Sequence, residues 1–291
     1  MDFESLNNNV VLAYKFVFFI FGTVGNVLFI HLIYKKKQLR SRSSILQCAQ
    51  CVFHIICLFG TVVDSFFIFD STLTRRKCFT HIFFYIFCQA AQGLIMLFIM
   101  LDFLVMIRFP MFYRNISNSI YFGLTCIPII SYSLFVVSFG YFTTTEEQIH
   151  ACNPLFAFSV TSSLVLKCLI LILCSITMII YIILIRMFHR KDRTPNCDSL
   201  KIMRRLQFSV VIFIFTWLFS QIIALIFLRD GAMVKSERMI FAHNSLFIVL
   251  SYSNTFYVTI WRSEEYRKQF FRIWRKNRAP LSTRPNTLPS F

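Results

Sequence analysis

Two long stretches of the chain contain no charged residue at all. Residues 206–228 include no Asp, Glu, Lys or Arg, and neither do residues 119–145. A helix on the surface of a water-soluble protein carries charge on its exposed face, whereas a helix that is apolar all round is buried or faces lipid. Both stretches are also long enough to cross a hydrocarbon core of about 30 Å, which takes about 20 residues. They therefore predict membrane-spanning helices.

Five further stretches share this length and character. The seven expected spans cover residues 10–34, 43–69, 78–107, 119–141, 155–187, 206–228 and 239–261. The apolar residues do not alternate with period two, as the strands of a membrane barrel would require. The overall composition agrees, because 57% of the residues are hydrophobic and only 15% are charged. We expect an all-α seven-transmembrane helix bundle, with residues 1–9 outside the cell, residues 10–261 forming the seven-transmembrane domain, and residues 262–291 forming a cytosolic amphipathic helix and tail.

The basic residues are distributed unevenly between the two sides of this arrangement. Of the 30 Lys and Arg residues, 22 lie in the tail and in the connections after spans one, three and five, and six lie in the remaining connections. Loops rich in Lys and Arg stay in the cytosol. The sequence therefore predicts a cell-membrane protein with its amino terminus outside. The net charge of +17 then indicates topology and attraction to anionic membrane lipids, so no nucleic acid is expected as a partner.

Several residues fall at informative spacings along the spans. Asn26 follows Gly25 in span one, Cys78 opens span three, and Asp102 follows Cys78 by 24 residues. Pro110 lies eight residues beyond Asp102, in the run Ile-Arg-Phe-Pro-Met-Phe-Tyr-Arg (107–114). After span seven comes Trp-Arg-Ser-Glu-Glu-Tyr-Arg-Lys-Gln-Phe (261–270), which is typical of an amphipathic basic helix on a membrane surface.

This set resembles the rhodopsin-like G-protein-coupled receptors, and most closely the nematode serpentine chemoreceptors of class SX (Srsx). In that class span three typically ends in Asp-Arg-x-x-Ala-Val-x-Phe-Pro-x-x-Tyr-Arg, and span seven runs into Trp-Arg-Ser-x-Glu-Tyr-Arg-x-x-Phe. The resemblance covers about residues 10–275 of the chain. It implies a chemosensory receptor that couples an extracellular small-molecule or peptide ligand to a heterotrimeric G protein. It also implies a disulfide between Cys78 and Cys152, which occupy the two places that the family joins.

The chain departs from the receptor pattern at several switch positions. The Arg expected after Asp102 is Phe103, and the Asp that binds sodium in many relatives is replaced by His54. Asn254 lacks the proline that usually follows it, which removes a kink point. These losses favour an alternative, a seven-helix protein that no longer couples to a G protein and acts as a trafficking partner or a transporter- or channel-like protein. The expected switch and coupling residues are Asn26, His54, Asp102, Phe103, Pro110, Phe213, Trp217, Asn254, Arg204 and Arg205.

A ligand pocket is expected between the outer halves of spans three, five, six and seven, because an interior cavity of a bundle lies between its helices. The candidate pocket residues are Tyr85, Gln89, Gln92, Lys167, Trp217, Gln221 and Asn244. The amides and Tyr85 could equally form hydrogen bonds to a neighbouring helix. Aminergic receptors carry an Asp where this chain has Tyr85, so a biogenic amine is not expected. Phe213 and Trp217 would form an aromatic hinge beneath the pocket.

Lys167 is an ionisable residue inside a span, and such residues are costly and often functional. One interpretation pairs its ammonium with Asp64 near the outer end of span two, or with an acidic ligand. The alternative has Lys167 reaching up to water beside Glu146 and Glu147.

No arrangement of residues predicts catalysis. The sequence holds no His-Glu-x-x-His, Gly-x-Ser-x-Gly or Gly-rich phosphate loop. Cys48 and Cys51 have the spacing of a redox or zinc pair, but both fall at bilayer depth, where packing is the simpler interpretation. We therefore expect neither an enzyme nor a bound metal or cofactor.

Overall fold

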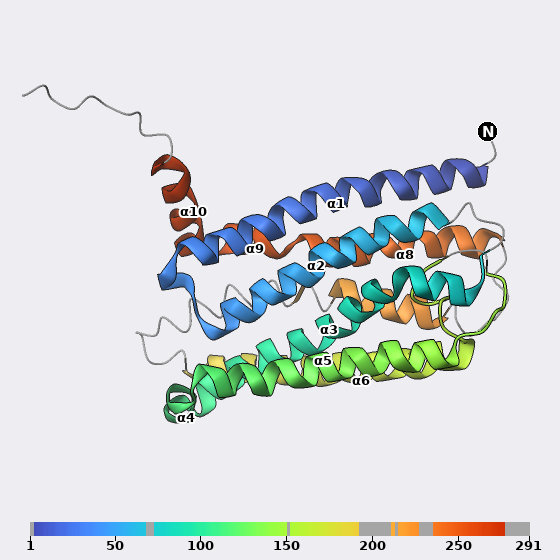
Figure 1. The fold of residues 1–291 in the computed structure, drawn as a ribbon. Helices are drawn as coiled ribbons and strands as arrows, with labels where there is room; N and C mark the ends of the chain where they lie inside the picture. Colours follow the sequence, from blue (N-terminus) through green and yellow to red (C-terminus); the bar gives the residue numbers. More distant parts are fainter. Residues whose placement is uncertain are drawn as a thin grey trace, which may run out of the picture.

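The computed structural model describes residues 3–67, 73–149, 152–191, 211–212, 215–226 and 235–276. The described parts are almost entirely helical, and the long helices run side by side along one direction (Figure 1). The helices are α1 (Phe3–Lys35), α2 (Arg42–Phe66), α3 (Arg75–Arg108), α4 (Pro110–Asn115), α5 (Asn118–Thr143), α6 (Val160–Lys191), α8 (Lys235–Ser253), α9 (Thr255–Arg262) and α10 (Glu264–Lys276).

Five helices are long and apolar enough to cross a bilayer, namely α1, α2, α3, α5 and α6. A shorter apolar helix, Phe215–Ile226, occupies the sixth position in the order, and α8 with α9 occupies the seventh. The predicted fold, an all-α seven-transmembrane bundle followed by a short helix, is confirmed. The chain is a multi-pass membrane protein.

Two helices begin at other residues than the hydropathy of the sequence predicts. Helix α1 extends back to Phe3, and in this extra part the Asn7 amide oxygen lies 3.0 Å from Nε2 of His243 in α8. Helix α6 begins at Val160 instead of residue 155. Before it, the Asn153 side chain accepts hydrogen bonds from the backbone of Leu155 and Phe156, which closes a separate turn. Polar contacts, which hydropathy does not register, therefore accompany both differences.

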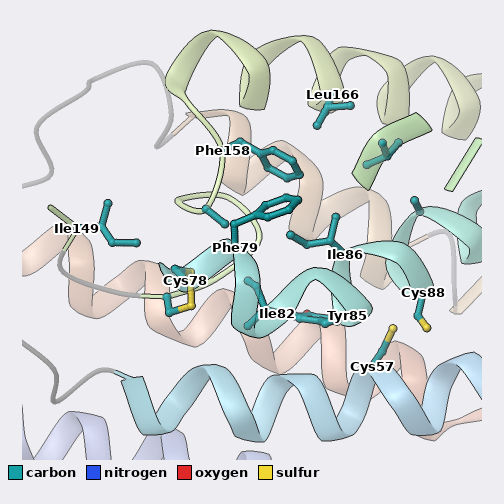
Figure 2. Packing of buried hydrophobic residues seen from close by; sticks show 14 of the residues in the cluster. Cys57, Cys78, Phe79, Ile82, Tyr85, Ile86, Cys88, Ile149, Phe158 and Leu166 are labelled. Carbon is teal, nitrogen blue, oxygen red and sulfur yellow. A yellow bond between two sulfur atoms is a disulfide. The ribbon is translucent and has the colours of Figure 1, made fainter. Parts of the chain in front are cut away.

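Helix α3 is the centre of the bundle and packs against α2, α5 and α6. Its neighbours come close because small residues face it. A Cβ on Gly140 of α5 would lie 2.2 Å from the Phe158 ring and 2.6 Å from the Phe79 ring. Figure 2 shows Phe158 lying on Phe79. Because the hydrophobic effect does not drive helices together within lipid, the close contact that small residues allow supplies much of the packing energy.

The two ends of the bundle differ in what closes them. At one end, called the disulfide end, Cys78 of α3 is bonded to Cys152 in the connection between α5 and α6. At the other, called the α4 end, α4 crosses between α3 and α5, and α10 turns away from the bundle axis (Figure 1). Tyr266 fixes α10, because its buried side chain hydrogen-bonds Ser44 of α2 at 3.1 Å and stacks on Phe29 of α1.

The seventh helix is interrupted at Asn254, between α8 and α9, although the proline is missing. The Ser253 hydroxyl donates to the carbonyl of Val249 at 2.7 Å, a bond that bends helices. On the facing side, Gly22 and Gly25 of α1 leave room for Ser253 and Tyr257. The seventh helix therefore packs closely against α1 on both sides of the interruption.

We predict that Gly140→Ala lowers the thermal stability and surface expression of the protein. The new methyl group would meet two buried rings, and overpacking of this kind costs about 1–3 kcal/mol. Gly123→Ala in the same helix is the matched control, because a Cβ there would contact nothing within 4 Å. It should be neutral or stabilising, since Ala is the better helix former. Equal losses for both variants in a thermal unfolding assay would contradict the close approach at Gly140.

Candidate functional site

The disulfide end is closed by the connection between α5 and α6. The Cys78–Cys152 disulfide confirms the predicted bond. Arg75 adds to it: its guanidinium forms an ion pair with Glu147 at 2.8 Å and donates to the carbonyls of Phe156 and Phe158. The side chain of Arg75 is largely buried, so these bonds hold the connection across the top of α3.

Asp64 is neutralised by a residue that the sequence reasoning missed. The Lys15 ammonium of α1 lies 2.7 Å from the Asp64 carboxylate and 2.9 Å from the Ser65 hydroxyl. Both charged side chains are buried. The proposed pairing of Asp64 with Lys167 is therefore wrong. Lys15 is itself an ionisable residue inside a span, so the signal that drew attention to Lys167 would also have found it.

Lys167 of α6 instead reaches the sixth helix. Its ammonium donates to the side-chain oxygen of Gln221 at 2.6 Å, and its side chain is buried. The alternative that placed it in water beside Glu146 and Glu147 is also wrong, because these two carboxylates pair with Arg76 and Arg75. Lys167 and Gln221, two candidate pocket residues, are thus brought together.

A third candidate, Asn244 of α8, joins this group. Its amide nitrogen donates to the backbone carbonyl of Ser220 at 3.2 Å, next to Gln221. Trp217 lies one turn earlier on the sixth helix and is buried. It packs onto α3 at Gly93, where an added Cβ would be 3.0 Å from its ring. Lys167, Gln221, Ser220 and Asn244 therefore form a polar chain across three helices, which we call the Lys167 cluster.

The remaining candidate pocket residues lie elsewhere, on the side of α3 that faces α2. Gln92 donates to the sulfur of Cys57 in α2 at 3.1 Å, and Tyr85 packs against Gly60 of the same helix. Figure 2 shows Tyr85 and Cys57 in this apolar layer. Gln89 is buried on α3. Gln92 and Asn244 therefore form hydrogen bonds to neighbouring helices, which is the alternative to a role in a ligand pocket.

Three of the expected switch residues gather where α1, α2 and the seventh helix meet. The Asn26 amide donates to the backbone carbonyl of Tyr252 at 3.0 Å. The His54 ring lies against the Tyr252 ring, and its Nδ1 is 3.4 Å from the Thr255 hydroxyl. Asn254 lies at the interruption between these two contacts. Neutral hydrogen bonds therefore join these helices where a sodium-binding carboxylate would otherwise lie.

At the α4 end, Asp102 is buried and accepts a hydrogen bond from the Tyr113 hydroxyl at 3.3 Å. Arg42, at the start of α2, donates to the carbonyls of Tyr113 and Ile116, each at 2.6 Å. The Arg42 guanidinium also lies over the rings of Tyr113 and Tyr121. Burial and the Asp102 carboxylate raise the pKa of the Tyr113 hydroxyl, so Tyr113 remains a donor.

Phe103 points away from this network. Its side chain is only 2% exposed and belongs to the apolar core around α3. Arg42 therefore supplies the cation near Asp102 that the sequence does not place after it. Sequence reasoning missed Arg42 and gave Tyr113 no role of its own. Tyr113 belongs to the run that carries the family resemblance, whereas no spacing rule indicates Arg42.

Other predicted residues lie at the edges of this region or outside it. Pro110 is exposed and forms the first residue of α4, a position where its missing amide hydrogen costs nothing. Phe213, Arg204 and Arg205 lie outside the described residues. In the part of the chain that the structure covers, no three His, Cys, Asp or Glu side chains gather as metal ligands would.

A helical membrane bundle with a disulfide from the top of its third helix has the architecture of a seven-helix receptor. Comparison with protein families matches residues 19–274 to the serpentine type seven-transmembrane G-protein-coupled chemoreceptors, Srsx. The chain belongs to this family, which is a family of receptors and not of enzymes. Comparison with curated proteins gave no significant match.

We predict that Lys15→Met strongly destabilises the bundle, because it leaves the Asp64 carboxylate buried without its cation. Breaking one side of a buried ion pair costs about 3–5 kcal/mol, whereas replacing both sides with apolar groups is often neutral. Lys15→Met combined with Asp64→Leu should therefore recover most of the loss in thermal stability. If the double variant is less stable than Lys15→Met alone, the two residues do not act as a pair.

Proposed function

We propose that the protein is a chemosensory receptor that couples an extracellular ligand to a heterotrimeric G protein. The family and the seven-helix fold support the receptor class. The network of Arg42, Tyr113 and Asp102 is the observation that carries the coupling. It joins α2, α3 and α4 at the α4 end, where a G protein would bind between the helix ends.

The orientation that we propose places the disulfide end outside the cell and the α4 end in the cytosol. The positive-inside distribution of Lys and Arg supports it. Residues 1–9 would then be extracellular, residues 10–261 would form the receptor domain, and residues 262–291 would lie on the cytosolic side. Exposed Arg267, Lys268 and Arg272 on α10 would face anionic lipid headgroups in this arrangement.

In the resting receptor the network keeps the α4 end closed. Arg42 binds the backbone of the connection between α4 and α5, and Tyr113 binds Asp102 of α3. A ligand that favours a more open bundle would have to break the Tyr113–Asp102 bond. Because ligand binding can only shift an existing equilibrium, weakening this bond should shift it in the same direction.

We predict that Tyr113→Phe raises ligand-independent G-protein activation. The variant keeps the ring beneath Arg42 and removes only the hydroxyl that binds Asp102. A hydrogen bond to a charged group contributes about 1.5–3 kcal/mol, which corresponds to roughly a tenfold or larger shift in the equilibrium. Nucleotide exchange on G proteins added to membranes measures the effect. Tyr141→Phe, the same change at an exposed residue of the disulfide end, is the matched control.

A second function deserves a test because Phe103 replaces the arginine of the family pattern. A seven-helix protein that has lost coupling would act as a trafficking partner or as a transporter- or channel-like protein. Phe103 is buried, so Phe103→Arg would place a guanidinium in the core and does not cleanly restore the pattern. Unchanged nucleotide exchange in Tyr113→Phe, at normal surface expression, would favour this second function. A ligand-dependent current without a G protein would indicate a channel.

The proposed orientation predicts that Asn115 carries no glycan. Asn115-Ile116-Ser117 is a glycosylation sequon, and glycans are added only on the luminal side, which becomes the outside of the cell. Asn115→Gln should leave the electrophoretic mobility unchanged before and after glycosidase treatment. A sequon carried on an added amino-terminal tag should be glycosylated. A glycan on Asn115 would show that the true topology is the inverse of the one proposed.

A further inference from the structure

We propose that Lys167 binds the carboxylate group of the ligand, so that the receptor recognises small organic anions. The proposal deepens the receptor function given above and rests on it. It starts from the charges buried in the bundle, because a charge inside a membrane protein needs a partner.

Among the described residues, the buried Lys and Asp side chains are Lys15, Asp64, Asp102 and Lys167. Three of them have charged partners or neighbours. Lys15 and Asp64 neutralise each other at 2.7 Å. Asp102 lies beside the network that holds the Arg42 guanidinium.

Lys167 is different, because its partner in the described part of the chain is the neutral amide oxygen of Gln221. The carboxylates of Glu146 and Glu147, in the connection that precedes α6, are already paired with Arg76 and Arg75. The Lys167 cluster therefore holds a buried amine with no carboxylate among the described residues. A carboxylate brought by a ligand would supply one.

The cluster also has hydrogen-bonding capacity to spare. An ammonium has three donors, and Lys167 uses one of them on Gln221. The Ser220 hydroxyl is buried next to Gln221 in the sequence, and within the described residues it has no hydrogen-bond partner. Buried polar groups are normally satisfied, so this unused hydroxyl in the Lys167 cluster indicates a place for a polar ligand.

A carboxylate fits this set of groups better than other chemistry does. Its oxygens can accept from the Lys167 ammonium, and bonds between ionised groups are about twice as strong as neutral ones. An amine ligand would be repelled by Lys167. An alcohol or amide could form hydrogen bonds but would leave the charge unmatched.

The depth of the cluster suits a ligand that enters from the disulfide end. Lys167 lies seven residues after the start of α6, which is about 10 Å along the helix. Gln221 is one turn beyond Trp217 toward the same end. A bound carboxylate would therefore lie above Trp217, which packs on the central helix α3.

Binding to the detergent-purified full chain tests the proposal without any G protein. The probes are sodium hexanoate, octanoate, benzoate and phenylacetate at millimolar concentration, each beside its neutral amide. At least one carboxylate should raise the midpoint of thermal unfolding by about 2–4 °C, and its amide should not. Lys167→Met should weaken that binding by roughly 30-fold or more. If no carboxylate stabilises the protein more than its amide, or if Lys167→Met binds equally well, the proposal fails.

A second measurement supplies the carboxylate from the protein itself. Gln221→Glu would place a carboxylate within reach of Lys167, so it should raise the unfolding midpoint and abolish stabilisation by carboxylate probes. In the Lys167→Met background the same change should lower the midpoint. Gln92→Glu is the matched control, because the buried Gln92 amide bonds the sulfur of Cys57 and not a lysine, and it should be destabilising. If Gln221→Glu destabilises the protein as much as Gln92→Glu does, Lys167 is not an unmatched cation. Carboxylate binding without nucleotide exchange would refute G-protein coupling and leave the ligand assignment standing.

Discussion

A lipid bilayer offers polar side chains no water, and the structure of this bundle depends on where its buried polar groups find partners. Charges are matched across helices, as Lys15 and Asp64 are between α1 and α2. Neutral groups bind the backbone of a neighbour, as Asn26 does with the carbonyl of Tyr252. Because each of these bonds joins two helices, satisfying the polar groups also fixes the arrangement of the bundle.

The same constraint gives the two ends of the bundle different properties. The disulfide end is closed by a covalent bond and by Arg75, which holds the connection between α5 and α6 through an ion pair and two carbonyls. Among the described residues, the α4 end is held by non-covalent contacts, including the hydrogen bonds of Arg42 and Tyr113. Hydrogen bonds can be exchanged at small net cost, whereas a disulfide cannot. A bundle built in this way can change shape at one end while the other end keeps its form.

Much of this fold could be predicted from the sequence, because hydropathy responds directly to the bilayer. The five long helices each overlap a predicted span, with the largest differences at the starts of α1 and α6, and the family pattern located the Cys78–Cys152 bond. The partners of the polar residues were harder to predict. Asp64 was assigned to Lys167 because both lie inside spans, but which helices are adjacent decides the pairing, and α1 packs against α2.

The candidate site could also be predicted from the sequence only in part. A pattern of spacings compares each residue with its counterpart in a family, so the loss of the arginine after Asp102 was visible. Its replacement by Arg42 was not, because Arg42 comes from another helix.

The ion pair between the first two helices also bears on how the chain enters the membrane. Helix α1 is synthesised first and carries Lys15, whose charge opposes insertion of the helix into lipid. Its counter-charge, Asp64, lies near the far end of α2 and becomes available only when that helix is almost complete. The two helices are therefore better inserted as a hairpin than one after the other. The first step in assembling this receptor would then depend on a charge that ends up out of reach of both water and ligand.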